Sequence, residues 1–191
     1  ELKRVKSNVK ATCQDILLIT FFTVLVISYY FKGPSGGADM LMHLSKVRII
    51  IDNFPRIPRW NPYWYFGIPF LRIYPVLFYY SLALLGWIIS ILFHNLPLNE
   101  IIFSAFAIYT PLLFSIGAIS MYFLAREINL PRFGAVSSAL LFITSFNLYS
   151  YWAIGSYPNV ASILLSPLPL AIYIKGLKSR KLSYAPLTGL I

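Results

Sequence analysis

Long apolar stretches separated by short polar segments make up most of this chain. The apolar stretches are close to 18 residues, the length that carries a helix across the hydrocarbon core of a membrane. Backbone polar groups cannot stay unpaired in lipid, so such stretches must be helical. The pattern therefore predicts an all-α, polytopic integral membrane protein, with apolar runs at residues 16–31, 76–93, 101–125, 133–151 and 160–174 and a further run opening at Tyr184.

The largest polar interruption, residues 32–75, contains one amphipathic segment. Apolar side chains recur in it at intervals of three and four residues, which is the period of a helix. We predict a helix over residues 39–54 within a large first outer loop. Its buried stripe is expected to consist of Met40, Leu44, Val47, Ile51 and Phe54.

Asp39, His43 and Lys46 lie on a different face of this helix, one turn apart. At this spacing a carboxylate and an imidazole can share one small site, with the ammonium group beside them. Asp39 has two open interpretations, because an acid near a helix start can cap free N–H groups or act as a general base. His43 either forms hydrogen bonds at the membrane interface or joins that site. No second acid lies within two residues of Asp39, so the pattern gives little support to a divalent metal site.

Arginines and aromatic residues follow the helix. An arginine fork suits a phosphate group, and aromatic rings suit the flat face of a sugar or a lipid chain. The same composition is typical of an interfacial aromatic belt with arginines that bind lipid headgroups, so both interpretations stay open. The predicted substrate-binding residues are Lys46, Arg56, Arg59, Trp60, Asn61, Tyr63 and Trp64, together with Tyr157 from a later polar break at residues 152–159.

Composition agrees with a membrane location. Hydrophobic residues make up 58% of the 191 residues and charged residues 12%, and the mean hydropathy is +0.70. The net charge of +10 does not indicate nucleic acid, because the basic residues flank apolar runs and form no RNA-binding motif. They favour contacts with anionic membrane lipids and a role in topology. Cys13 is the single cysteine, which excludes an internal disulfide and a cysteine-based metal site.

Three basic clusters, at residues 3–10, 126–132 and 175–181, discriminate between two topologies. If residues 76–93 cross the membrane, the second and third clusters lie outside. If residues 76–93 dip in and return, or lie along the interface, all three clusters are cytoplasmic. The positive-inside rule favours the second topology. We therefore expect a multi-pass protein of the cell membrane with a cytoplasmic N-terminus and the first loop outside.

The chain begins without a methionine and stops within an apolar run. We expect residues 1–191 to form a single transmembrane domain that is incomplete at its C-terminal end. The missing C-terminal part of the same protein is then an expected partner.

Several short motifs in residues 36–75 carry a family resemblance. They are Gly37-Ala38-Asp39 with His43, the runs at residues 58–62 and 63–69, and Tyr74-Pro75 before an apolar run. With these motifs the chain resembles membrane proteins labelled 6-pyruvoyl-tetrahydropterin-synthase-related, which are similar to polytopic glycosyltransferases of the C superfold. The resemblance covers most of the chain and implies the N-terminal part of a C-superfold helical bundle. No pterin chemistry is visible in these residues.

The resemblance implies that Asp39 is the acid of the first outer loop that works on a sugar carried by a polyprenyl phosphate. The second outer loop, residues 152–159, has no acid. Members of the superfold often carry one there, so this departure weakens a metal-dependent mechanism, and no cofactor is expected.

The resulting hypothesis is a membrane glycosyltransferase of the cell envelope that moves a sugar from a polyprenyl-phosphate donor to an acceptor hydroxyl at the outer face. Asp39 would accept the proton, His43 would orient Asp39 or contact the sugar, and Arg56 or Arg59 would balance the departing phosphate. The alternative is a non-catalytic membrane protein, either a lipid-handling or transport component or a scaffold. Convergence of Asp39, His43 and an arginine on one cavity would distinguish the two.

Overall fold

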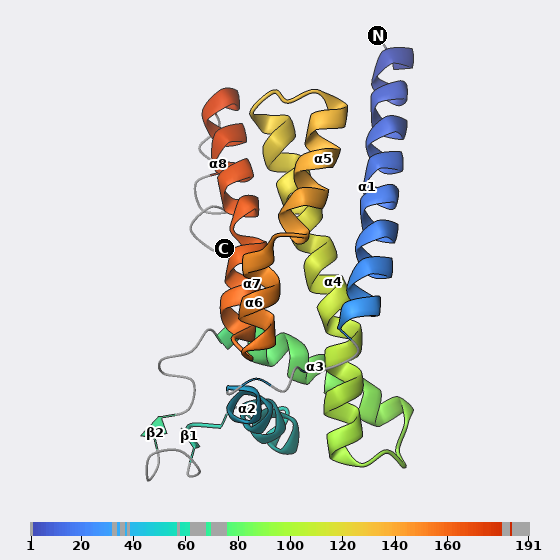
Figure 1. The fold of residues 1–191 in the computed structure, drawn as a ribbon. Helices are drawn as coiled ribbons and strands as arrows, with labels where there is room; N and C mark the ends of the chain where they lie inside the picture. Colours follow the sequence, from blue (N-terminus) through green and yellow to red (C-terminus); the bar gives the residue numbers. More distant parts are fainter. Residues whose placement is uncertain are drawn as a thin grey trace. The chain divides into compact units, whose positions relative to one another are not determined.

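The computed structural model describes residues 2–31, 34, 37, 39–56, 58–61, 68–69, 76–180 and 184, and these residues are almost entirely helical (Figure 1). This confirms the predicted all-α class. Within the described residues one short antiparallel pairing joins β1 (Trp60–Asn61) to β2 (Ile68–Pro69). The helices are α1 (Leu2–Tyr30), α2 (Met40–Asn53), α3 (Val76–Leu92), α4 (Leu98–Glu127), α5 (Arg132–Ile143), α6 (Phe146–Ala153), α7 (Tyr157–Leu165) and α8 (Pro167–Ser179).

Four helical stretches in the described part of the chain are long and apolar enough to cross a membrane: Val9–Tyr30, Leu98–Glu127, Arg132–Ala153 and Tyr157–Ser179. The prediction of a multi-pass membrane protein is confirmed at this level. The apolar helix α3 is shorter, with 17 residues. At 1.5 Å per residue it is about 26 Å long, less than the roughly 30 Å of a typical hydrocarbon core. A helix of 17 residues is at the lower end of the range for helices that cross a membrane, so the topology of residues 76–93 stays a prediction.

Two of the predicted runs contain a break. The run at 133–151 is divided at Thr144 and Ser145 into α5 and α6, and the run at 160–174 is divided at Ser166 into α7 and α8. Pro167 is the first residue of α8, where its missing N–H is tolerated and its fixed φ suits a helix start. Periodicity alone hides such breaks, because the residues on both sides remain apolar.

The polar break predicted at residues 152–159 is shorter than expected. Helix α6 continues through Ala153 and α7 begins at Tyr157. Trp152 and Tyr157 are fully buried, and packing of these large rings holds both ends of the break in helical form. Gly155 makes the turn between the helices with φ +88°, a conformation that glycine adopts without steric cost.

The helices form two compact units that are interleaved along the sequence. Unit 1 comprises Glu1–Tyr30, Pro111–Tyr149 and Ala161–Ile191, whereas unit 2 comprises Phe31–Thr110 and Ser150–Val160. The long helix α4 therefore contributes its first half to unit 2 and its second half to unit 1.

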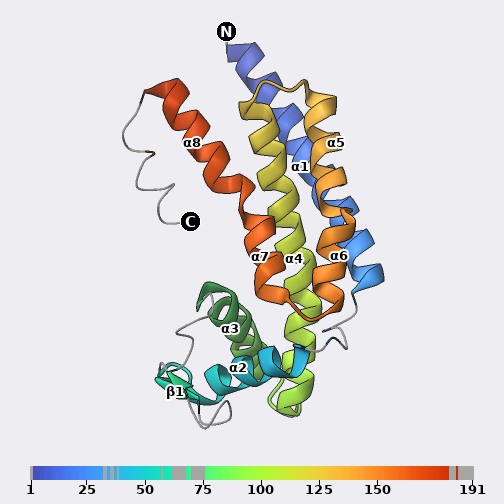
Figure 2. The same cartoon turned by 60° about the vertical axis from the view of Figure 1, so that its left-hand side comes forward.

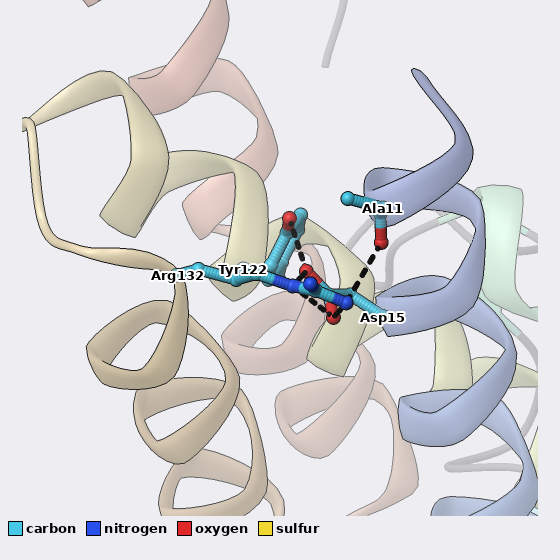
Figure 3. A network of polar contacts seen from close by, with 4 residues as sticks. All are labelled: Ala11, Asp15, Tyr122 and Arg132. Atoms are coloured by element: carbon cyan, nitrogen blue, oxygen red, sulfur yellow. Dashed lines mark hydrogen bonds and ion pairs between the residues drawn. The ribbon is translucent and has the colours of Figure 1, made fainter. Parts of the chain in front are cut away.

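A polar network inside unit 1 ties α1 to α4 and α5 (Figure 3). Arg132 Nε donates to both carboxylate oxygens of Asp15 at 2.8 Å, and the Tyr122 hydroxyl donates to Asp15 Oδ2 at 3.0 Å. Arg132 Nη2 also donates to the Ala11 carbonyl oxygen at 3.3 Å. Asp15 is 5% exposed, so this buried carboxylate is neutralised where three helices meet. The sequence gives no sign of this network, because Asp15 is one of several polar residues before an apolar run.

Basic residues from three separate segments lie at one end of unit 1. Lys178 at the end of α8 donates to the carbonyl oxygen of Glu127, the last residue of α4, and to Asn129 Oδ1 in the α4–α5 connection. Arg132 at the start of α5 reaches Ala11 and Asp15 of α1. The beginning of α1, the α4–α5 connection and the end of α8 lie at the same end in both views (Figures 1 and 2). The three clusters thus share an end, as the favoured topology requires. Which side of the membrane they occupy stays a prediction.

In unit 2, α2 packs on α3 with a face that the sequence analysis did not expect to be buried. The buried residues of α2 are His43, Lys46, Val47 and Ile50. The predicted burial stripe was therefore wrong except for Val47, because Met40, Leu44, Ile51 and Phe54 are only half-buried. Long polar side chains can bury their carbon atoms against apolar neighbours, and the rings described below cover His43 and Lys46.

A backbone-to-backbone contact joins the start of α2 to the α6–α7 turn. The Asp39 N–H donates to the Ile154 carbonyl oxygen at 3.3 Å. A Cβ on Gly37 would lie 2.1 Å from the Ile154 carbonyl carbon, and one on Gly155 would lie 2.7 Å from the Met40 nitrogen. Both positions therefore require glycine. The contact agrees with the prediction that residues 152–159 share a side with the first loop.

Candidate functional site

Helix α2 carries the three polar residues that the sequence analysis singled out. It begins at Met40, and Asp39 occupies the N-cap position. The predicted helix at 39–54 is thus observed as Met40–Asn53. Asp39 is exposed, and among the described contacts its carboxylate makes no capping hydrogen bond to the helix. The carboxylate therefore remains accessible at the positive end of the helix dipole.

His43 lies one turn further and is only 3% exposed. Its Nδ1 and the Tyr79 hydroxyl of α3 share a hydrogen bond of 2.5 Å. The rings of Tyr79 and Tyr157 lie with their centroids 5.8 Å from that of His43. Tyr79 was not predicted as a site residue, because in the sequence it is one aromatic residue inside an apolar run.

Lys46 follows on the same face and is 1% exposed. Its Nζ lies 5.9 Å from the centroid of the Tyr79 ring, within the roughly 6 Å at which an ammonium group interacts with an aromatic face. Tyr79 therefore contacts both His43 and Lys46 and links the two polar groups. We name Asp39, His43, Lys46 and Tyr79 the α2 cluster.

Burial changes the pKa values of two residues in the α2 cluster, His43 and Lys46. Burial lowers the pKa of His43 to about 4, with a further lowering by the charge of Lys46 and an opposing effect from Asp39. Burial also lowers the pKa of Lys46 to about 8, against the opposing charge of Asp39. At neutral pH the imidazole is therefore uncharged, and Lys46 is mostly protonated although its proton is held less firmly than usual.

Tyr157, the one predicted site residue from the second loop, belongs to this region. It is fully buried at the start of α7, beside the imidazole of His43. Its ring centroid lies 4.6 Å from that of Trp152 and 5.1 Å from that of Phe106. Tyr157 thus forms part of an aromatic wall behind His43.

The remaining candidates lie beyond the other end of α2. Arg56, Arg59 and Trp60 are exposed, whereas Asn61 is buried in the β1–β2 pairing. Helix α2 has 14 residues and is therefore about 21 Å long, so no described contact joins these arginines to Asp39. Convergence of Asp39, His43 and an arginine is not observed among the described residues, where Lys46 is the cation on their face. Tyr63 and Trp64 lie outside the described residues.

The α2 cluster contains one acid and one histidine. Among the residues that the structure describes, no group of three or more His, Cys, Asp or Glu side chains is arranged to hold a metal ion. Along one face of α2 the cluster contains an accessible carboxylate, a buried neutral imidazole and a buried ammonium group.

Comparison of the chain with models of protein families, with curated proteins and with solved structures finds no match.

Proposed function

We propose that this protein is a membrane glycosyltransferase that moves a sugar from a polyprenyl-phosphate-linked donor to an acceptor hydroxyl. The finer parts of this proposal are the C-superfold architecture, the outer face of the cell membrane as the site of reaction and a role in the cell envelope. The four candidate membrane spans support a substrate that is anchored in lipid.

The proposed step uses the Asp39 carboxylate as a general base. Asp39 takes the proton of the acceptor hydroxyl while the acceptor oxygen forms a bond to the anomeric carbon. The bond between that carbon and the phosphate oxygen breaks, and the polyprenyl phosphate leaves with the electron pair. Lys46 contributes positive potential near the developing phosphate charge. The neutral imidazole of His43, which shares a hydrogen bond with Tyr79, orients the Asp39 carboxylate.

The observation that carries this proposal is that the Asp39 carboxylate is exposed and does not cap the helix. Asp39 stands where an acid would normally cap the helix. Nevertheless it is exposed and makes no capping hydrogen bond within the described part of the chain. An acid that does not cap the helix remains available for proton transfer.

A non-catalytic membrane protein is the second candidate, and burial is the observation in its favour. His43 and Lys46 are almost completely enclosed, as expected for groups whose role is to hold α2 on α3. In that case the α2 cluster is part of a scaffold, and Asp39 is an incidental surface acid.

Replacing Asp39 by Asn separates the two functions. The amide keeps the shape but cannot accept the proton, so transfer from a polyprenyl-phosphate sugar should fall about 10²–10⁴-fold. The melting temperature should stay unchanged, because no cap is lost. The matched control is Asp52→Asn, which alters another exposed acid of the same helix. Full transfer by the Asp39→Asn protein would rule out the base.

A further inference from the structure

A cavity lies on the side of α2 that faces away from His43 and Lys46. It has a volume of about 280 Å³ and lies within unit 2, between α2 and the first turns of α4. Apolar side chains from both helices form its walls, including Leu41, Leu44, Ile102 and Phe103. Met40 and Leu44 belong to the stripe that the sequence predicted to be buried, and both line this cavity.

The lining of this cavity also includes polar residues. Arg48 of α2 and Asn99 of α4 both line the cavity, and both are exposed. Arg48 Nε lies 3.7 Å from Asp52 Oδ2, with both side chains at least half exposed. An exposed ion pair at this distance is weak, so the guanidinium group can exchange Asp52 for a stronger acceptor.

The position of the cavity points to the membrane interface. Asn99, Ile102 and Phe103 belong to the first turns of α4, which begins one of the four candidate spans. A cavity at the end of a span lies where hydrocarbon chains give way to headgroups. Leu41 is 71% exposed and Phe103 46% exposed, and such large apolar groups beside a cavity mark an interaction site when they are contiguous.

We propose that this cavity binds one anionic phospholipid. An acyl chain lies against Leu41, Leu44 and Phe103, and the headgroup phosphate accepts hydrogen bonds from Arg48, with the Asn99 amide as a second donor. A guanidinium group matches the geometry of a phosphate. A lipid with net negative charge is preferred, because a zwitterionic headgroup carries its own cation that competes for the phosphate. This site is independent of the proposed transfer activity.

Native mass spectrometry of the full chain in detergent tests the site, with phosphatidylglycerol and phosphatidylcholine of identical acyl chains as probes. Phosphatidylglycerol should bind more tightly. Arg48→Gln should weaken its binding roughly tenfold, as expected for loss of a charge-assisted hydrogen bond, and should remove the preference over phosphatidylcholine. The matched control is Arg126→Gln, an exposed arginine of unit 1. Equal effects of the two arginine variants would overturn the proposal, because binding would then follow overall charge.

A second variant tests the acyl-chain half of the site without endangering the fold. Leu41→Ser changes an exposed side chain and should weaken binding of both lipids. Glycerol 3-phosphate, which offers the phosphate without a chain, should fail to displace phosphatidylglycerol. Unchanged lipid binding by the Leu41→Ser protein, or full displacement by glycerol 3-phosphate, would mean that the cavity does not hold a lipid chain.

Discussion

His43 is a buried base whose environment disfavours its charged form. Only 3% of the residue is exposed, and it contacts the hydroxyl of Tyr79 and the ring of Tyr157. Its pKa is lowered to about 4, mainly by burial, whereas an unfolded histidine titrates near 6.5. Below pH 6.5 the unfolded chain therefore binds more protons than the folded chain, and folding becomes less favourable.

This difference predicts a loss of stability on acidification. The contribution of His43 is fully present above about pH 6.5 and is lost as the pH falls towards 4, by at most about 3 kcal/mol. Melting curves in detergent across this range should show the decrease, and His43→Gln should reduce it, because the amide does not titrate. His94→Gln removes the other histidine, which is exposed, and should leave the decrease intact. An identical pH profile for the His43→Gln and unchanged proteins would contradict the prediction.

At the residue scale, the helical period is enough to predict that Asp39, His43 and Lys46 lie on one helix face. The sequence could not show that His43 and Lys46 are buried. Their burial depends on Tyr79 and Tyr157, which come from distant segments. The roles predicted for Arg56 and Arg59 rested on composition and stay predictions. Composition contains no information about the length of α2, which separates these arginines from Asp39.

At the scale of elements, a partly exposed ion pair contributes to the position of α1. Asp15 is its contact with Arg132 of α5 and Tyr122 of α4. Apolar packing also holds α1, because Ile19 and Ile27 are fully buried. The ion pair adds a polar contact between α1 and α5 to this packing.

A double-mutant cycle should detect this coupling. Asp15→Asn should lower the free energy of unfolding by about 2 kcal/mol, because a buried partner of an arginine is lost. Asp15→Asn and Arg132→Gln together should cost clearly less than the sum of the single changes. The measurement is thermal or denaturant unfolding of the four proteins in one detergent.

Lys175→Gln provides the control for this cycle. Lys175 is an exposed residue of α8, so its effect should add to that of Asp15→Asn without coupling. Strict additivity of Asp15→Asn and Arg132→Gln would show that the contact contributes nothing to the position of α1.

The hydrophobic pattern predicts the membrane spans better than the breaks between their helices. All four candidate spans coincide with predicted apolar runs, because crossing a membrane is a question of length and composition. The helix of the first loop is correct to within one residue at each end. The break at Thr144 and Ser145 was missed, because it depends on local hydrogen bonding. The break predicted at residues 152–159 was observed around Gly155 but is shorter, because Trp152 and Tyr157 are packed within the flanking helices.

At the scale of the whole molecule, the charge distribution predicts orientation. Basic residues of α1, the α4–α5 connection and α8 share one end of unit 1, and such ends face the cytoplasm. In a Cys13→Ser background, a cysteine at Ser156 should react with an impermeant thiol reagent in intact cells. A cysteine at Ser179 should react only after the membrane is opened. Labelling of position 179 from outside would reverse the proposed orientation.

The contact between Asp39 and Ile154 has a consequence for the order of synthesis. These residues are more than a hundred positions apart, yet their backbones touch through glycines on both sides. A chain emerging from the ribosome completes its N-terminal segments first, so α2 and α3 exist before Ile154 and Tyr157 have been made. Three of the four spans are synthesised before these last partners appear. Until the third span has been inserted, the face of α2 that carries His43 and Lys46 is therefore incompletely covered.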